Sequence, residues 1–241
     1  MQIVNTFKCN FKCEHCMFDC TPSKKEMLSM GHFYEFVDKY AEDESYVNLC
    51  GGELFLHPDW YQQLKHLLLV CETVRIVTNG SLFFTRTGRQ TKLYKQFLEL
   101  CESFGFGKLT ICISYDIYHC GEYDRLNLYP LKEVIRRVRW ETEDYGITFE
   151  HDRREDRLKQ IAPFGRAKKN QIWDYDPECN VGEYFEATVG PTGEMYACCN
   201  LRIKLGDVFD SPEDIEAKYK LVKPPKSCLH CRTMFNKPQN R

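Results

Sequence analysis

The stretch Phe7-Lys-Cys-Asn-Phe-Lys-Cys-Glu-His-Cys16 places three cysteines, Cys9, Cys13 and Cys16, on one short segment directly after a predicted β-strand. Their spacing lets the three sulfur atoms face one point, because even an extended chain covers only about 3.5 Å per residue. Thiolates are the ligands that iron–sulfur clusters and zinc select. Three thiolates leave one iron of a four-iron cluster free, whereas a structural zinc site needs four closed protein ligands. The segment therefore predicts a metal centre with an open coordination position.

The composition predicts a soluble cytoplasmic protein. A chain of 241 residues can bury a substantial core. Its 33 basic and 35 acidic residues give no global field that would gather nucleic acid or an anionic membrane surface. The sequence has neither an apolar stretch long enough to span a bilayer nor the N-terminal pattern of a signal peptide. Fourteen cysteines without a signal peptide favour metal ligation in a reducing compartment.

Strand-like and helix-like segments alternate after the cysteines, which predicts parallel β/α units. Apolar runs predict strands within residues 46–50, 74–80, 109–116 and 147–150. Helical periodicity predicts helices at residues 33–40, 60–70, 93–104 and 131–145. Asp59 suits the N-cap of the second helix, and Pro130 suits the first turn of the fourth. A full sixth unit is not predicted, because residues 152–162 are too few for a crossover helix.

The spacing of the three cysteines, with the aromatic ring of His15 just before the last one, resembles the cluster loop of radical S-adenosylmethionine (SAM) enzymes. Three later segments resemble motifs of this family in the same order: Gly51-Gly52-Glu53, Thr78-Asn79-Gly80 and Ser114-x-Asp116. The resemblance implies an α/β fold, a partial (β/α)6 radical SAM barrel formed by residues 1–170. Its functional segments would follow the carboxyl ends of the strands.

The same resemblance implies roles for individual residues. Cys9, Cys13 and Cys16 would hold a [4Fe–4S] cluster whose open iron binds SAM. The residues implied to bind SAM are Gly51, Gly52 and Glu53 at the methionine end, Ser114 and Asp116 at the ribose, and Thr78, Asn79 and Arg125. His119, Asp124 and Arg125 are predicted to lie in a loop after the fourth strand, where relatives carry polar residues near SAM or substrate. A solvated loop is the alternative.

The C-terminal part of the chain carries a second set of cysteines, namely Cys179, Cys198, Cys228 and Cys231. Their spacing around Gly193 resembles the twitch form of the SPASM extension, which holds an auxiliary [4Fe–4S] cluster. The resemblance thus implies a second domain at residues 171–241. A turn-rich segment between two short β runs predicts a hairpin that returns Cys198 to Cys179. A structural zinc site satisfies the same ligands and is the alternative.

The other cysteines are expected to pack as small apolar residues. They are Cys20, Cys50, Cys71, Cys101, Cys112, Cys120 and Cys199. Cys20 and Cys120 also lie in predicted loops of the active face, where a thiol can donate a hydrogen atom. The segment Gly165-Arg166-Ala167 resembles a turn that closes the core domain in many relatives. The basic residues between Arg153 and Lys169 predict a solvated face, with a phosphate or acidic-substrate site as the alternative.

The resemblance implies reductive cleavage of SAM to methionine and a 5′-deoxyadenosyl radical, which takes a hydrogen atom from a substrate. An external donor such as flavodoxin or ferredoxin would supply one electron, and the auxiliary cluster would accept or relay one. Because the first strand begins at once, we expect no N-terminal domain that captures a leader peptide. This favours oxidation or rearrangement of a small molecule, such as a sugar or nucleoside. The alternatives are maturation of a ribosomally made peptide with a separate recognition partner, and a non-catalytic iron–sulfur or zinc protein.

Overall fold

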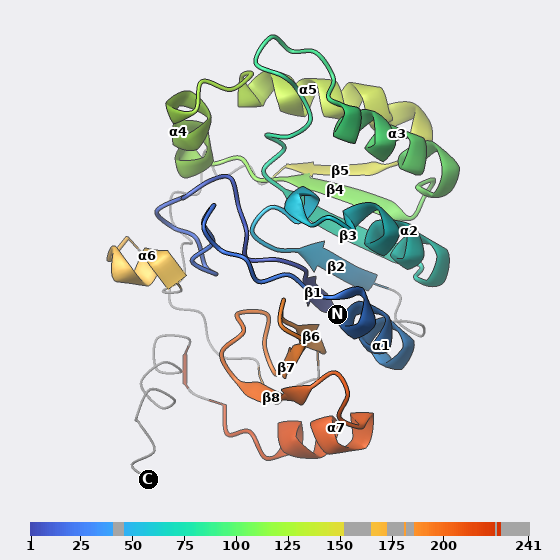
Figure 1. Ribbon diagram of the computed structural model, residues 1–241, viewed down its shortest axis with the longest axis vertical. Helices are drawn as coiled ribbons and strands as arrows, with labels where there is room; N and C mark the ends of the chain where they lie inside the picture. The colour runs from blue at the N-terminus through green and yellow to red at the C-terminus, as the bar shows by residue number, and fades with distance from the viewer. Residues whose placement is uncertain (41–45, 152–164, 173–180, 182–185, 225, 228–241) are drawn as a thin grey trace.

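An eight-stranded sheet with the order β5-β4-β3-β2-β1-β6-β7-β8 runs through the protein in the computed structural model (Figure 1). The structure describes residues 1–40, 46–151, 165–172, 181, 186–224 and 226–227. The strands are β1 (Gln2–Val4), β2 (Tyr46–Cys50), β3 (Thr73–Thr78), β4 (Leu109–Ile113), β5 (Thr148–His151), β6 (Thr188–Val189), β7 (Glu194–Tyr196) and β8 (Lys204–Asp207). Strands β1 to β5 are parallel, as the alternating sequence pattern predicts.

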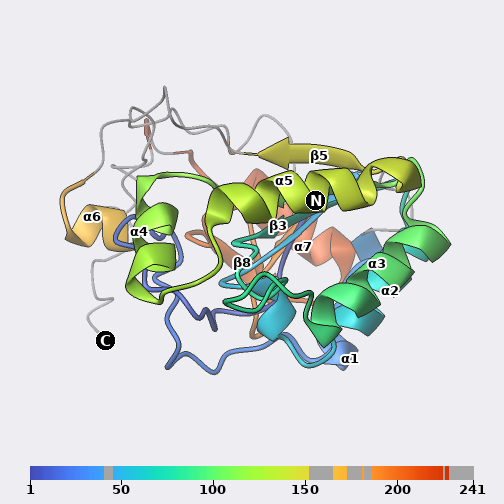
Figure 2. The same cartoon turned by 90° about the horizontal axis from the view of Figure 1, so that it is seen from above.

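Helices connect the parallel strands. The α-helices are α1 (Met30–Tyr40), α2 (Trp60–Val70), α3 (Lys92–Phe104), α4 (Ile117–Arg125), α5 (Leu131–Thr142), α6 (Gly165–Lys169) and α7 (Pro212–Lys220). Two 3₁₀ turns, η1 (Leu54–Leu56) and η2 (Glu143–Tyr145), complete the described elements. Figure 2 shows α2 and α3 side by side, and these two helices pack against each other.

The strands present different faces to the core and to a cavity. Strand β4 is buried along its whole length, as expected for a central parallel strand covered on both faces. In β3, Val74 and Ile76 are buried, while Arg75 and Val77 are half-buried and line a cavity. Successive side chains of a strand point to opposite faces. The sheet therefore has one apolar face that packs on helices and one more polar face that opens to a cavity.

An aromatic cluster holds the helices against the apolar face. Phe55, Phe83 and Phe97 have ring centroids 5.1–5.6 Å apart, and Tyr94 stands 4.7 Å from Phe83. Phe83, Tyr94 and Phe97 are completely buried. Such rings dominate the apolar area that a core removes from water. Helix α3 begins where Thr91 accepts a hydrogen bond from the backbone N–H of Tyr94, at 3.2 Å.

The predicted C-terminal hairpin is confirmed. Strands β6 and β7 are antiparallel, and the turn between them closes through the backbone N–H of Gly190, which donates to the carbonyl of Glu194 at 2.9 Å. Gly193 has a φ of +89°, a conformation that favours glycine. The hairpin also continues the main sheet, because β6 pairs in parallel with β1.

Four local predictions differ from the structure. His119, Asp124 and Arg125, predicted to lie in a loop, belong to helix α4. Asp59 occupies the N-cap of α2 but makes no side-chain cap bond, and Gly165-Arg166-Ala167 begins helix α6 instead of forming a turn. The fourth predicted helix is divided into α5 and η2. The doubtful sixth unit at residues 152–162 lies outside the described residues.

Among the described residues, no helix combines the length and apolar character needed to cross a membrane.

Candidate metal centre and cofactor pocket

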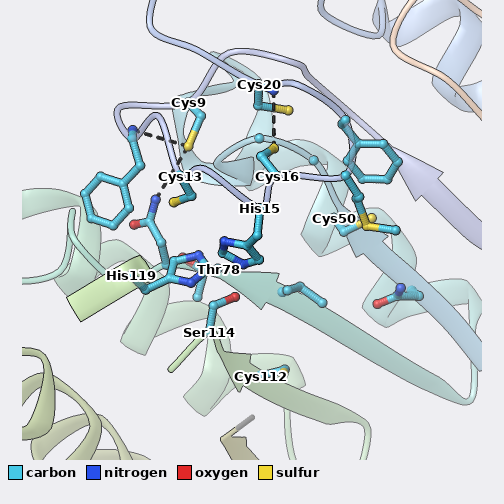
Figure 3. A pocket seen from close by; sticks show the side chains of 18 of the residues that line it. Cys9, Cys13, His15, Cys16, Cys20, Cys50, Thr78, Cys112, Ser114 and His119 are labelled. Carbon is cyan, nitrogen blue, oxygen red and sulfur yellow. Dashed lines mark hydrogen bonds between the residues drawn. The ribbon is translucent and has the colours of Figure 1, made fainter. Parts of the chain in front are cut away.

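The loop after β1 brings Cys9, Cys13 and Cys16 to one side of a cavity of about 430 Å³ (Figure 3). Cys9 and Cys13 are buried, and Cys16 is half-buried. The loop is tied to the sheet by backbone hydrogen bonds from the two residues Gly52 and Glu53, just after the end of β2. Gly52 donates to the carbonyl of Thr6 at 2.7 Å, and Glu53 donates to that of Lys8 at 2.9 Å. All three cysteines thus line the same cavity.

Hydrogen-bond donors reach two of the three sulfur atoms, those of Cys9 and Cys16. The backbone N–H of Phe11 donates to Cys9 Sγ at 3.4 Å, and that of Cys20 donates to Cys16 Sγ at 3.3 Å. The side-chain amide of Asn79 reaches Cys9 Sγ at 3.8 Å. Donors to sulfur are a feature by which proteins stabilise and tune iron–sulfur clusters. The described donor set therefore fits a cluster held by three thiolates.

The thiols of Cys9 and Cys16 differ in acidity. Burial, together with the nearby Glu53, raises the pKa of Cys9. The pKa of Cys16 is lowered to about 6, mainly by a hydrogen bond from the Cys20 thiol, with help from backbone N–H groups and the charge of Arg166, and against the effect of burial. A low pKa favours the thiolate form of Cys16, which is the form that ligates metal.

Gly51 and Gly52 lie just after β2, at positions where a side chain would collide with the segment from Thr6 to Cys9. A Cβ on Gly52 would lie 2.8 Å from the carbonyl carbon of Lys8 and 3.0 Å from Cys9 Cβ. A Cβ on Gly51 would lie 2.7 Å from the carbonyl oxygen of Thr6. The two glycines let the end of β2 lie directly against the cysteine loop and line the cavity.

Glu53 links the ends of β2 and β3. Its carboxylate is fully buried and accepts hydrogen bonds from Thr78 Oγ1 at 2.8 Å, from the backbone N–H of Asn79 at 2.8 Å, and from that of Phe55 at 3.3 Å. Burial raises the pKa of Glu53 to about 7, and these donors limit the rise. Glu53 is thus held by protein donors and is not among the described residues that line the cavity.

Asp116 organises the other side of the pocket. Its carboxylate caps α4 by accepting from the backbone N–H groups of Tyr118 and His119, both at 2.9 Å. It also pairs with His119 Nδ1 at 2.7 Å and with His15 Nε2 at 3.3 Å. Burial opposes ionisation, but the two imidazoles hold the pKa of Asp116 well below its usual range.

His119 connects Asp116 to the cysteine loop. Burial disfavours its charged form, yet hydrogen bonds to Asp116 and to Cys13 raise the pKa of His119 to about 10. The ligand atoms of His15, Asp116 and His119 lie within 4.8 Å of one another, but Asp116 Oδ2 already serves both rings.

Most predicted SAM contacts gather at this cavity, and two do not. Those that line it are Gly51, Gly52, Thr78, Asn79, Ser114 and Asp116. Arg125 is not among the lining residues that the structure describes; its side chain is 54% exposed and pairs with Glu122 at 2.6 Å. Glu53 stands behind the lining, as described above. The ends of β2, β3 and β4 thus supply the wall that faces the cysteines.

Several lining residues were not predicted. Cys50 and Cys112, expected to pack in the core, line the cavity, and burial raises the pKa of Cys50 to about 12. Beside them, Asn48 donates to Gln2 Oε1 at 3.3 Å, and Arg75 donates to Asn48 Oδ1 at 3.4 Å. The alternation along β3 could have predicted that Arg75 faces the cavity, because Arg75 lies between two buried apolar residues of the strand.

The predicted auxiliary site is described only at Cys198. Cys179, Cys228 and Cys231 lie outside the described residues. Cys198 is half-buried after β7. Its neighbour Cys199, expected to be a packing residue or spare thiol, lines the main cavity, and its carbonyl accepts from Gln2 Nε2 at 3.0 Å.

Two proteins of Bacillus subtilis (strain 168) are similar in sequence. The antilisterial bacteriocin subtilosin biosynthesis protein AlbA is 29% identical over 92 residues, which are 38% of this chain and 20% of AlbA. The putative peptide biosynthesis protein YydG is 27% identical over 115 residues, which are 46% of this chain and 34% of YydG. The similarity thus covers only a fifth and a third of these relatives. No family model matches the chain.

Among solved structures, histidine-tagged anSMEcpe with bound AdoMet superposes with a TM-score of 0.56 at 13% identity, covering 89% of this chain and 79% of that one. Native anSMEcpe with bound AdoMet and the Cp18Cys peptide gives a TM-score of 0.54 at 12% identity, covering 92% and 83%. This likeness concerns the fold and confirms the predicted class, a partial barrel around a parallel sheet. The four motifs, which lie in order at one cavity, agree with this fold and support the resemblance to radical SAM enzymes.

Proposed function

We propose that this protein is a peptide-modifying radical SAM enzyme that binds a [4Fe–4S] cluster through Cys9, Cys13 and Cys16. The observation that carries the proposal is the meeting of these three sulfur atoms, with their N–H donors, at a cavity walled by the ends of β2, β3 and β4. Three protein thiolates leave an open iron, which suits the amino and carboxylate groups of SAM.

When bound, the cluster and SAM supply one-electron cleavage of the sulfonium and a 5′-deoxyadenosyl radical that takes a hydrogen atom from substrate. The chain's own residues would bind and orient SAM. Gly51 and Gly52, which line the cavity beside the cysteines, would orient the methionine end of SAM. Ser114 and Asp116 would bind the ribose, and Asp116 is held in place by its two histidine partners.

A peptide substrate is favoured by the relatives. AlbA and YydG are named for bacteriocin and peptide biosynthesis, and one anSMEcpe structure holds a peptide. These names favour peptide modification over the small-molecule substrate expected from the sequence.

We further propose that Cys179, Cys198, Cys228 and Cys231 hold an auxiliary [4Fe–4S] cluster, with zinc as the alternative, in a C-terminal domain that follows a core of residues 1–170. The support is the cysteine spacing and the hairpin, which ends two residues before Cys198. The electron for SAM cleavage would come from an external donor such as flavodoxin or ferredoxin.

The test is reductive cleavage of SAM. Protein reconstituted without oxygen is mixed with SAM and dithionite, and 5′-deoxyadenosine is measured by mass spectrometry. We expect the wild type and a Cys101→Ala control, altered in the core, to form the nucleoside, and the Cys9/Cys13/Cys16→Ala variant to form none. A wild type that forms no more than the triple variant contradicts the proposal.

A further inference from the structure

Arg166 makes several of the described contacts between helix α6 and the cysteine loop. The side chain is 8% exposed and lies far along the sequence from the loop it contacts. Its Nη1 donates to the carbonyl of Cys13 at 2.9 Å, its Nη2 donates to the carbonyl of Cys20, and its backbone N–H donates to the carbonyl of Cys16 at 2.9 Å. Figure 1 shows α6 beside the N-terminal loop. One residue thus reaches three cysteine carbonyls of the loop.

Asp19 completes the attachment from the loop side. It accepts from Arg166 Nε at 2.9 Å and pairs with Lys169 Nζ. Asp19 has a φ of +57°, in the left-handed region that aspartate and asparagine tolerate better than most residues. Burial opposes ionisation of Asp19, but the hydrogen bonds from Lys169 and Arg166 lower its pKa. The buried guanidinium is therefore paired, and the pair stands against the loop that carries the metal ligands.

The charge of Arg166 acts on the sulfur atoms as well as on the loop. Its buried guanidinium donates to the carbonyls of Cys13 and Cys20, which flank Cys16 in the loop, so a positive charge stands beside the ligands and attracts negative charge there. A cluster gains one negative charge when it is reduced, so the same interaction favours the reduced form. Asp19, 35% exposed, offsets part of this effect.

We propose that Arg166 is a positioning residue that fixes the cysteine loop and makes the cluster bound there easier to reduce. This assignment rests on the proposed cluster at Cys9, Cys13 and Cys16. It replaces both sequence-based interpretations of this arginine, the solvated face and the phosphate site, because its guanidinium is buried and already bound to the loop.

The test measures the midpoint potential of the [4Fe–4S] cluster by an EPR-monitored redox titration of the full chain, without SAM. Arg166→Gln removes the charge. We expect a tenfold weaker reduction equilibrium, equivalent to a midpoint more negative by about 59 mV. Arg166→Lys keeps the charge and should recover most of the shift. Arg136→Gln, at an exposed arginine of α5, is the matched control and should leave the midpoint unchanged.

Asp19→Asn gives a second variant whose shift has the opposite sign. Asparagine tolerates the backbone of Asp19 but leaves Arg166 less neutralised, so the midpoint should become less negative. If the Arg166→Gln protein does not retain its cluster, the direction of the midpoint shift in Asp19→Asn tests the inference. A loaded Arg166→Gln protein with the wild-type midpoint, or an Asp19→Asn midpoint that is unchanged or more negative, overturns the inference. A wild type without any [4Fe–4S] signal overturns the proposed function instead.

Discussion

Glu53 is a carboxyl group withdrawn from water and held by three protein donors at the junction of β2 and β3. Because burial raises its folded-state pKa to about 7, above the ordinary 4.5, its contribution to stability is complete below about pH 4.5 and is lost as the pH rises through 7. We predict that the free energy of unfolding of the apoprotein falls by about 3 kcal/mol more across this range in the wild type than in Glu53→Gln. Urea unfolding at pH 4.5 and 7 measures it; parallel curves for the two proteins would refute it.

Gly52 tests the close approach of β2 to the cysteine loop. A methyl group there would meet the backbone of Lys8, which cannot move without displacing Cys9. We predict that Gly52→Ala costs at least about 2 kcal/mol and lowers the iron content of reconstituted protein. Gly121→Ala is the control, because a Cβ at Gly121 in α4 meets nothing within 4 Å and should slightly stabilise the helix. Full iron loading of Gly52→Ala would show that the approach is not needed.

The sequence pattern predicted the proposed cluster ligands better than the residues that hold the cysteine loop in place. The cysteine spacing alone predicted which sulfur atoms meet, because ligands so close in sequence can reach only a small region of space. Arg166 was missed because its partners lie far away in sequence, and a basic residue among other basic residues is typical of a solvated surface. Cys50 and Cys112 were misplaced for a related reason: an apolar run does not reveal which face of a strand opens to a cavity.

At the scale of elements, α4 and α7 are both capped by a side chain, but only the cap of α4 also serves the pocket. Ser211 accepts from the backbone N–H of Asp214 at 3.1 Å and stands at the surface. Asp116 caps α4 and holds two histidines. We predict that Ser211→Ala lowers the free energy of unfolding by about 1 kcal/mol and Asp116→Ala lowers it by on the order of 3 kcal/mol. The larger loss is expected because removing Asp116 leaves its two histidine partners without their carboxylate.

Chemical denaturation of both variants measures the difference. Asp116→Ala should also weaken SAM binding, while Ser211→Ala should not, as followed by equilibrium binding under anaerobic conditions. Equal losses of stability would mean that the histidine contacts of Asp116 add nothing to its role as a cap.

Element boundaries were predicted well where the apolar period is strong. Helix α2 has the predicted bounds, and β2 does as well. Helix α4 was missed because Tyr123 is its one buried residue, so it lacks an apolar stripe. Its stability comes from the Asp116 cap and from contacts with the cysteine loop, such as Tyr123 against Phe11 at 5.5 Å. Those contacts exist only in the folded chain, beyond the reach of a local pattern.

At the scale of the whole molecule, the hairpin and β8 extend the sheet past β1, so the C-terminal segment is continuous with the sheet that carries the cysteine loop. This arrangement places Cys199 in the main cavity. The auxiliary-cluster proposal then predicts about eight irons per chain after anaerobic reconstitution, four for each cluster. Elemental analysis for iron and zinc checks it: about four irons with one zinc would assign the C-terminal cysteines to zinc.

The central claim is that the three cysteines of the N-terminal loop hold a cluster with an open iron that binds SAM. The most direct measurement is the EPR spectrum of the dithionite-reduced protein before and after SAM is added, with Cys198→Ala included to weaken the auxiliary signal. We predict that SAM changes the g values of the signal that is lost in the Cys9/Cys13/Cys16→Ala variant. A signal from this cluster that stays identical when SAM is present in excess would contradict the account.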